Sequence, residues 1–174
     1  IKISKRAGSY LTLKDLIDEV GCDATRYFLV ARRPDSQLVF DIDLAKSQNN
    51  DNPVFYIQYA HARISKVLEQ WGGDISTLKL DDSFIFDSQI ELKLIKNISI
   101  YPEIIIQATN ELAPHQIANF LKDCAADLHS YYNDSKFLVE DEKIRVARLS
   151  LINSAKYVLK NGLGLLGIEA PQQM

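Results

Sequence analysis

The chain has 174 residues, of which 47% are hydrophobic and 25% charged, with a formal net charge of −3 at pH 7. This composition is typical of a globular protein with a sizeable core, and no apolar run reaches the length of a membrane span. Residues 1–48 carry 8 Lys or Arg against 7 Asp or Glu, and residues 49–174 carry 12 against 16. These balances exclude binding of RNA by bulk charge, so any RNA recognition must be local, through stacking and a few placed cations.

The chain begins with a short basic segment that contains Lys2, Ser4 and Lys5 and ends at Gly8. Two ammonium groups, a hydroxyl and the N–H groups of a glycine-containing loop are suited to holding a polyphosphate. From charge alone, a solvated basic surface is the commoner explanation of such a cluster.

Local signals before residue 49 predict a small mixed segment. Thr12 and Asp15 have the spacing of a capping box, and Gly21 ends the apolar pattern that follows. Asp23 is the expected N-cap of a second helix, which Pro34 ends. The predicted elements are a helix over 13–20, a helix over 24–33 and a strand over 38–42.

The clearest helix is predicted from Pro53 to Trp71. The polar run 49–52 marks a domain boundary, with Asn52 as the N-cap and Pro53 at the first helical position. Gly72 ends the helix. Apolar residues recur at three- and four-residue steps and predict one buried stripe: Val54, Ile57, His61, Ile64, Leu68 and Trp71.

A second stripe of this helix carries Tyr56, Tyr59 and Arg63, roughly 120° round from the apolar one. Two phenol rings and a guanidinium on one face offer stacking surfaces for unpaired bases and a contact for a phosphate. The alternative is structural, with the tyrosines packed against a neighbouring helix and Arg63 covering the seam. His61, on the apolar stripe, is expected to be a hydrogen-bonded core histidine.

Four more helices are predicted, from about Ser88 to Ile100, after Pro102, from Pro114 to about Asp134, and from about Glu142 to Gly162. Residues 104–106 and Ala108 are expected in the core. Tyr132 lies at the edge of an apolar stripe, where it either presents a ring or packs on the loop 133–140. Met174 is either a frayed end or a thioether available to pack on a base.

The two cysteines, Cys22 and Cys124, have no metal-ligand spacing, so reduced thiols in a cytoplasmic protein and no metal site are expected. Met174 is also the only methionine in the sequence, and the chain opens inside what resembles a loop. We therefore expect an excised fragment.

Several segments resemble the bacterial type of arginyl-tRNA synthetase, a class I aminoacyl-tRNA synthetase. The first, residues 2–6, resembles the KMSKS loop, with Ile3 in place of Met and Arg6 in place of the last Ser. The others are Ala7-Gly8, Thr12-Leu13, Asp23-Ala24 with Arg26-Tyr27-Phe28, residues 50–54, 59–63, Tyr132-Asn133 and residues 160–167. The resemblance covers nearly the whole chain.

This resemblance implies the C-terminal part of an enzyme that activates arginine with ATP and Mg²⁺ and transfers it to tRNA(Arg). It implies ATP contacts for Lys2, Ser4 and Lys5, of which the two lysines would stabilise charge in catalysis. It implies contacts with the anticodon loop for Tyr56, Tyr59, Arg63, Tyr132 and Met174. Because the ATP-binding fold is missing, we expect the chain alone to be inactive, to bind no cofactor, and to need the catalytic domain of the same polypeptide.

The expected architecture is all-α. An antiparallel bundle of about five helices occupies residues 49–174, and residues 1–48 form the edge of a catalytic domain. The alternative function is a helical module that docks a protein through the face of Tyr56, Tyr59 and Arg63, because Tyr and Arg are also favoured in protein interfaces. No membrane partner is expected.

Overall fold

A computed structural model describes residues 12–81 and 83–174. The basic segment with Lys2, Ser4 and Lys5 therefore lies outside the described residues. The elements in chain order are α1 (Leu13–Val20), α2 (Cys22–Val30), α3 (Ile42–Lys46), α4 (Pro53–Trp71), a 3₁₀ turn η1 (Ile75–Thr77), α5 (Gln89–Ser99), α6 (Tyr101–Asn110), α7 (His115–Asp134) and α8 (Glu142–Leu165).

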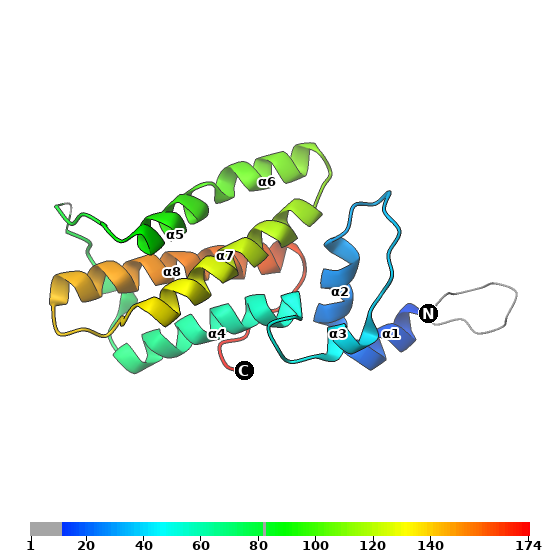
Figure 1. The fold of residues 1–174 in the computed structure, drawn as a ribbon, viewed down its shortest axis with the longest axis horizontal. Coiled ribbons are helices and arrows are strands. Elements are labelled where there is room, and N and C mark those ends of the chain that lie inside the picture. Colours follow the sequence, from blue (N-terminus) through cyan, green and yellow to red (C-terminus); the bar gives the residue numbers. More distant parts are fainter. Residues whose placement is uncertain (1–11, 82) are drawn as a thin grey trace, which may run out of the picture.

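The helices α4, α7 and α8 pack side by side along the long axis of the molecule (Figure 1). α5 packs on α7 and α8, and α6 packs on α7. α1, α2 and α3 form a small cluster at one end of the bundle, joined to it through contacts of α2 with α4 and α7. The predicted all-α fold, an antiparallel helical bundle, is thereby confirmed.

The N-terminus of α4 is fixed by Asn52, which is buried. Its side-chain oxygen accepts from the N–H of Val54 at 3.2 Å, and its amide donates to the carbonyls of Ala45 and Ser47 at 3.1 and 2.8 Å. One side chain thus caps α4 and ties it to the end of α3. Pro53 at the first turn and Gly72 in the left-handed region at φ 67° complete the predicted start and end of the helix.

The apolar stripe of α4 faces the bundle core. Ile57 and Ile64 are 0% and 1% exposed, and His61 is buried among them, as predicted. The remaining fully buried side chains come mainly from α7 and α8: Leu121, Cys124, Tyr131, Leu149, Ile152, Leu159 and Leu163. This single core fixes the positions of α4 and α7, whose outer flanks carry the candidate site.

The strand predicted over 38–42 is wrong. Residues 37–41 have no regular structure, and Ile42 begins α3 because Asp41 accepts from the N–H of Leu44 at 2.9 Å. No strand in the described part of the chain is available to pair with this segment. The helix predicted over 24–33 forms earlier, as α2, with Gly21 at its N-cap in place of Asp23.

Gly162 does not end the last helix, contrary to expectation. α8 continues to Leu165, and a Cβ on Gly162 would lie 2.5 Å from the side chain of Leu121. Glycine at this position therefore permits close packing of α8 on α7. The core prediction for residues 104–106 and Ala108 is correct for Ala108, whereas Ile106 is 60% exposed.

Candidate functional site

A pocket of about 560 Å³ lies between α4, α7 and the C-terminal tail. α4 supplies one wall, α7 supplies Tyr132, and the tail closes the third side. The lining residues are Tyr59, Ala62, Arg63, Lys66, Glu69, Gln70, Tyr132, Gln172, Gln173 and Met174. Its volume is within the range of about 300–1,000 Å³ that is common for small-molecule sites.

Arg63 occupies the centre of this site. Its guanidinium carbon lies 3.6 Å from the ring centroid of Tyr132 and 5.3 Å from that of Tyr59. Both separations are those of a cation against the electron-rich face of an aromatic ring. Tyr59 remains 36% exposed and Met174 55% exposed, so the pocket offers an aromatic ring and a thioether to a ligand.

Two side chains of α7 hold the guanidinium in place. Arg63 donates from Nη1 to Nδ1 of His129 at 2.9 Å and from Nη2 to Oδ1 of Asn133 at 3.1 Å. Arginine has no acceptor, so Nδ1 of His129 must be unprotonated. The ring therefore carries its proton on Nε2, which donates to the carbonyl of Tyr56 at 3.1 Å.

This arrangement requires a neutral His129. Burial lowers the pKa of His129 below its ordinary value, and the positive charge of Arg63 lowers it further, against the opposing effect of the hydrogen bond to Tyr56. Both hydrogen-bond partners of Arg63 are thus uncharged, and no carboxylate in the described residues forms an ion pair with it. The guanidinium is positioned without being neutralised.

Tyr56 occupies a different place from the other candidates. Its ring lies 4.4 Å from the ring of His129, between centroids, and it does not line the pocket. Burial raises the pKa of its phenol, and the charge of Arg63 partly opposes this. The structure therefore brings Tyr59, Arg63, Tyr132 and Met174 together, while Tyr56 supports His129 from behind.

His129 and Asn133 were not among the site residues predicted from the sequence, although Asn133 lies in a segment that carries the family resemblance. The signal was present, because residues 129, 132 and 133 recur at the three- and four-residue steps of one helix face, as residues 56, 59 and 63 do on α4. Recognising it required knowing that α4 and α7 are neighbours.

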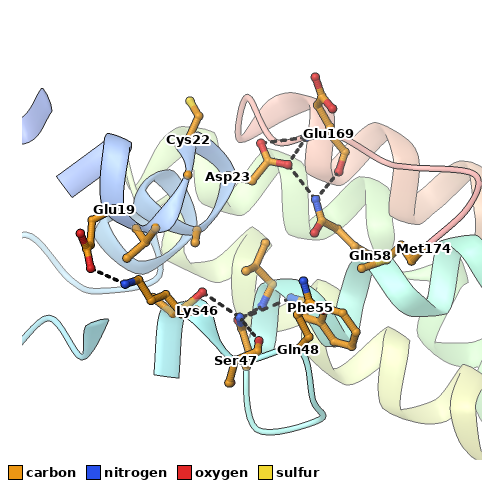
Figure 2. Close-up of a pocket in the computed structure, with 16 residues that line it drawn as sticks. Glu19, Cys22, Asp23, Lys46, Ser47, Gln48, Phe55, Gln58, Glu169 and Met174 are labelled. Atoms are coloured by element: carbon orange, nitrogen blue, oxygen red, sulfur yellow. Dashed lines mark hydrogen bonds and ion pairs between the residues drawn. The ribbon is translucent and has the colours of Figure 1, made fainter. Parts of the chain in front are cut away.

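A second hollow, of about 670 Å³, lies where α1–α3 meet α4 and the tail (Figure 2). Glu19 of α1 and Lys46 of α3 form an ion pair at its edge. Phe55 lines it and stacks on Tyr59, with 6.0 Å between ring centroids. Met174 lines both hollows, so the end of the tail separates them.

Residues 12–81 and 83–174 contain no group of three His, Cys, Asp or Glu side chains placed to hold a metal ion. No helix in the same ranges is long and apolar enough to cross a membrane. Burial raises the pKa of the Cys124 thiol to about 12, consistent with a small core residue.

Residues 57–174 match the DALR anticodon binding domain family. Over its full length the chain is 52% identical to an arginine–tRNA ligase of Bordetella petrii and 50% identical to one of Thiobacillus denitrificans. In both cases it spans 31% of the relative, so the chain covers about a third of the length of these curated proteins.

The chain is also similar to solved structures of arginyl-tRNA synthetases. A crystal structure from Campylobacter jejuni, described as an arginyl-tRNA synthetase, matches 98% of this chain and 37% of its own, with a TM-score of 0.86 and 31% identity. The arginyl-tRNA synthetase of Thermus thermophilus matches 98% of this chain and 29% of its own, with a TM-score of 0.76 and 30% identity.

Proposed function

The chain belongs to the DALR anticodon binding domain family, and from this premise we propose that its pocket binds an unpaired nucleotide of the anticodon loop of tRNA(Arg). The observation that carries the proposal is the guanidinium of Arg63, held 3.6 Å over the ring of Tyr132 by two uncharged partners. A cation that forms no ion pair among the described residues, beside the partly exposed ring of Tyr59, suits a phosphate together with a base.

A small, local site is what the acidic charge of the molecule leads us to expect. The chain is acidic overall, with a net charge of −3, so RNA must be held by a few groups at one place. Arg63 and Lys66 supply positive charge on the pocket wall, Tyr59 supplies a partly exposed ring, and Met174 supplies a polarisable thioether. These groups suit a single-stranded loop better than a duplex.

The parent protein, in this proposal, is an arginine–tRNA ligase that consumes ATP, with Mg²⁺, in translation in the cytoplasm. Its activation step depends on positioning and on stabilisation of negative charge at the phosphates. Lys2, Ser4 and Lys5 are proposed as ATP contacts, with the two lysines stabilising the transition state. The boundary between the catalytic edge and the anticodon-binding bundle is proposed at residues 48 and 49.

The test is a binding titration of this chain with two unmodified transcripts of an arginine tRNA, one with the natural anticodon and one with an altered anticodon. We expect tighter binding of the transcript with the natural anticodon. Tyr59→Ala should weaken it by about tenfold, the loss typical of one base-stacking contact. Tyr157→Ala is the matched control, because Tyr157 on α8 is 55% exposed and lines neither hollow.

Equal affinity for the two transcripts would contradict recognition of the anticodon. Equal effects of the Tyr59 and Tyr157 substitutions would contradict the assignment of the pocket. Indifference of the chain to any tRNA would favour docking of a protein on the same face, since tyrosine and arginine also serve such surfaces.

A further inference from the structure

The C-terminal tail, residues 167–174, is held along α4 by side chains from two helices. His61 of α4 donates from Nδ1 to the carbonyl of Pro171 at 2.7 Å. Gln58, one turn earlier, donates to the carbonyl of Glu169 at 3.0 Å. These contacts fix the direction of the tail just before the residues that line the nucleotide pocket.

The third anchor comes from outside the bundle. Asp23 of α2 accepts the backbone N–H of Glu169, which lies 3.3 Å from each of its two carboxylate oxygens. It also accepts from the amide of Gln58 at 2.7 Å. Asp23, Gln58 and Glu169 thus form a closed triangle of hydrogen bonds that joins α2, α4 and the tail (Figure 2).

The same part of α2 touches the tail at a second point. Gly167 has φ 68°, and a Cβ at this residue would lie 2.9 Å from Nη1 of Arg26. Asp23 and Arg26 are three residues apart, so both project from one face of α2. Only four residues separate Glu169 from Met174, which forms a wall of the pocket beside Tyr59.

We propose that Asp23 is a positioning residue for the nucleotide pocket, holding the tail so that Gln172, Gln173 and Met174 close its third side. The proposal rests on the proposed function and adds a residue of α2 that lines only the other hollow. Through Asp23, the small helical cluster at the end of the bundle sets the shape of a site on its flank.

A purely local role for Asp23 makes a different prediction. A carboxylate in the first turn stabilises its own helix through the helix dipole, and Asp23 is in the first turn of α2. Asp43 has the same position in α3, and its side chain makes no hydrogen bond in the described structure. Asp43→Ala is therefore the matched control, because it removes a first-turn carboxylate without touching the tail.

The experiment is a double-mutant cycle on this chain, with binding of an anticodon stem-loop RNA as the readout. We expect Asp23→Ala to weaken binding by about fivefold and Asp43→Ala to leave it within about twofold. In a chain truncated after Pro171, Asp23→Ala should have no further effect. Asp23→Asn, which keeps one oxygen acceptor, should restore most of the affinity.

A second readout needs no RNA. Carboxypeptidase should release Met174 and Gln173 faster from the Asp23→Ala chain than from the unmodified or Asp43→Ala chains. If Asp23→Ala does not fold, Gln58→Leu opens the same triangle from α4 and should give the same two results.

An equal loss of affinity in the full and truncated chains would overturn the proposal, as would unchanged release of the tail. If Tyr59→Ala weakens binding but Asp23→Ala does not, the pocket binds RNA and the role of Asp23 is refuted. If the unmodified chain binds no stem-loop, the proposed function fails and the role of the tail in binding fails with it. The rate of tail release then still shows whether Asp23 holds the tail.

Discussion

Tyr131 and Tyr132 are neighbours in α7, yet they belong to two polar clusters of opposite character. Tyr131 is 0% exposed and donates to Oε1 of Glu91 at 2.7 Å, and Arg148 donates from Nε to the same oxygen at 3.3 Å. Tyr132 lies at the pocket under the guanidinium of Arg63. Each cluster combines a tyrosine with an arginine, but among the described residues a carboxylate bonds to the arginine only in the first, which we call the closed cluster. The open cluster is Arg63 with Tyr132, His129 and Asn133.

The difference shows how one helix contributes to both the buried core and the proposed binding site. In the closed cluster, the carboxylate of Glu91 neutralises Arg148 inside the fold, so no charge is left for a ligand. In the open cluster, His129 and Asn133 hold Arg63 by hydrogen bonds alone. Its charge remains available on the pocket wall. A rigid, unneutralised cation is what binding of an anionic, stacked ligand requires.

Substitution in the closed cluster should lower the stability of the protein more than substitution in the open cluster. We expect Glu91→Leu to lower the free energy of unfolding by about 3 kcal/mol, because it removes the buried acceptor of both Tyr131 and Arg148. Urea unfolding at pH 7 measures this, with the exposed Glu140→Leu as the control expected to change stability by less than about 0.5 kcal/mol. A loss below about 1 kcal/mol for Glu91→Leu would refute the contrast.

Substitution in the open cluster should weaken RNA binding strongly and change stability little. Arg63→Gln is expected to weaken binding of the anticodon stem-loop by about tenfold or more, while the free energy of unfolding changes by less than about 1 kcal/mol. Arg63→Lys keeps the charge but loses the planar fork, so its affinity should lie between those of the unmodified chain and Arg63→Gln. Full affinity in Arg63→Lys would show that charge alone matters and that the stacked geometry does not.

Converting the open cluster into a closed one sharpens the comparison. Asn133→Asp places a carboxylate where an amide oxygen now lies 3.1 Å from Nη2 of Arg63. We expect affinity to fall severalfold and the slope of log affinity against log salt to become shallower by about one unit. Asn161→Asp adds the same charge on α8, away from both hollows, and should change the slope much less. Identical salt slopes for these two variants would contradict a specific role of Arg63.

The smallest expected effect is a dependence of stability on pH. The pKa values of His61 and His129 are lowered from 6.5, chiefly by burial, so the unfolded chain binds protons more readily than the folded chain. Stability should therefore decrease as the pH falls from about 7.5 to 5.5, and His129→Asn should reduce the decrease. Thermal unfolding across this range measures the effect, and a flat profile would contradict neutral, buried histidines.

Much of the fold follows from local signals in the sequence. The capping box of Thr12 and Asp15, the cap at Asn52 and the apolar stripe of α4 all act within one or two helical turns, and each is present in the structure. The strand expected over 38–42 failed because strands need a partner that short-range patterns do not reveal. Gly162 was misjudged for the same reason, since its close neighbour Leu121 lies on another helix.

The candidate site also contains residues that local patterns predicted and contacts that they could not predict. The face of α4 with Tyr59 and Arg63 was predicted from residue spacing and family resemblance, and Tyr132 and Met174 from the resemblance; that these residues bind RNA stays a prediction. The contact of His129 with Arg63 spans 66 residues, and that of Asp23 with Glu169 spans 146. Spacing along one helix can mark a face, such as that of residues 129, 132 and 133, but it does not show which distant residue that face meets. That depends on how whole helices and the tail pack.

The most direct test of the central claim is a structure of this chain bound to an anticodon stem-loop of an arginine tRNA. An unpaired base should lie in the pocket against Tyr59, Arg63 and Met174, with Arg63 still bonded to His129 and Asn133. A loop bound elsewhere on the surface, or a guanidinium of Arg63 paired with a protein carboxylate in the complex, would contradict the account.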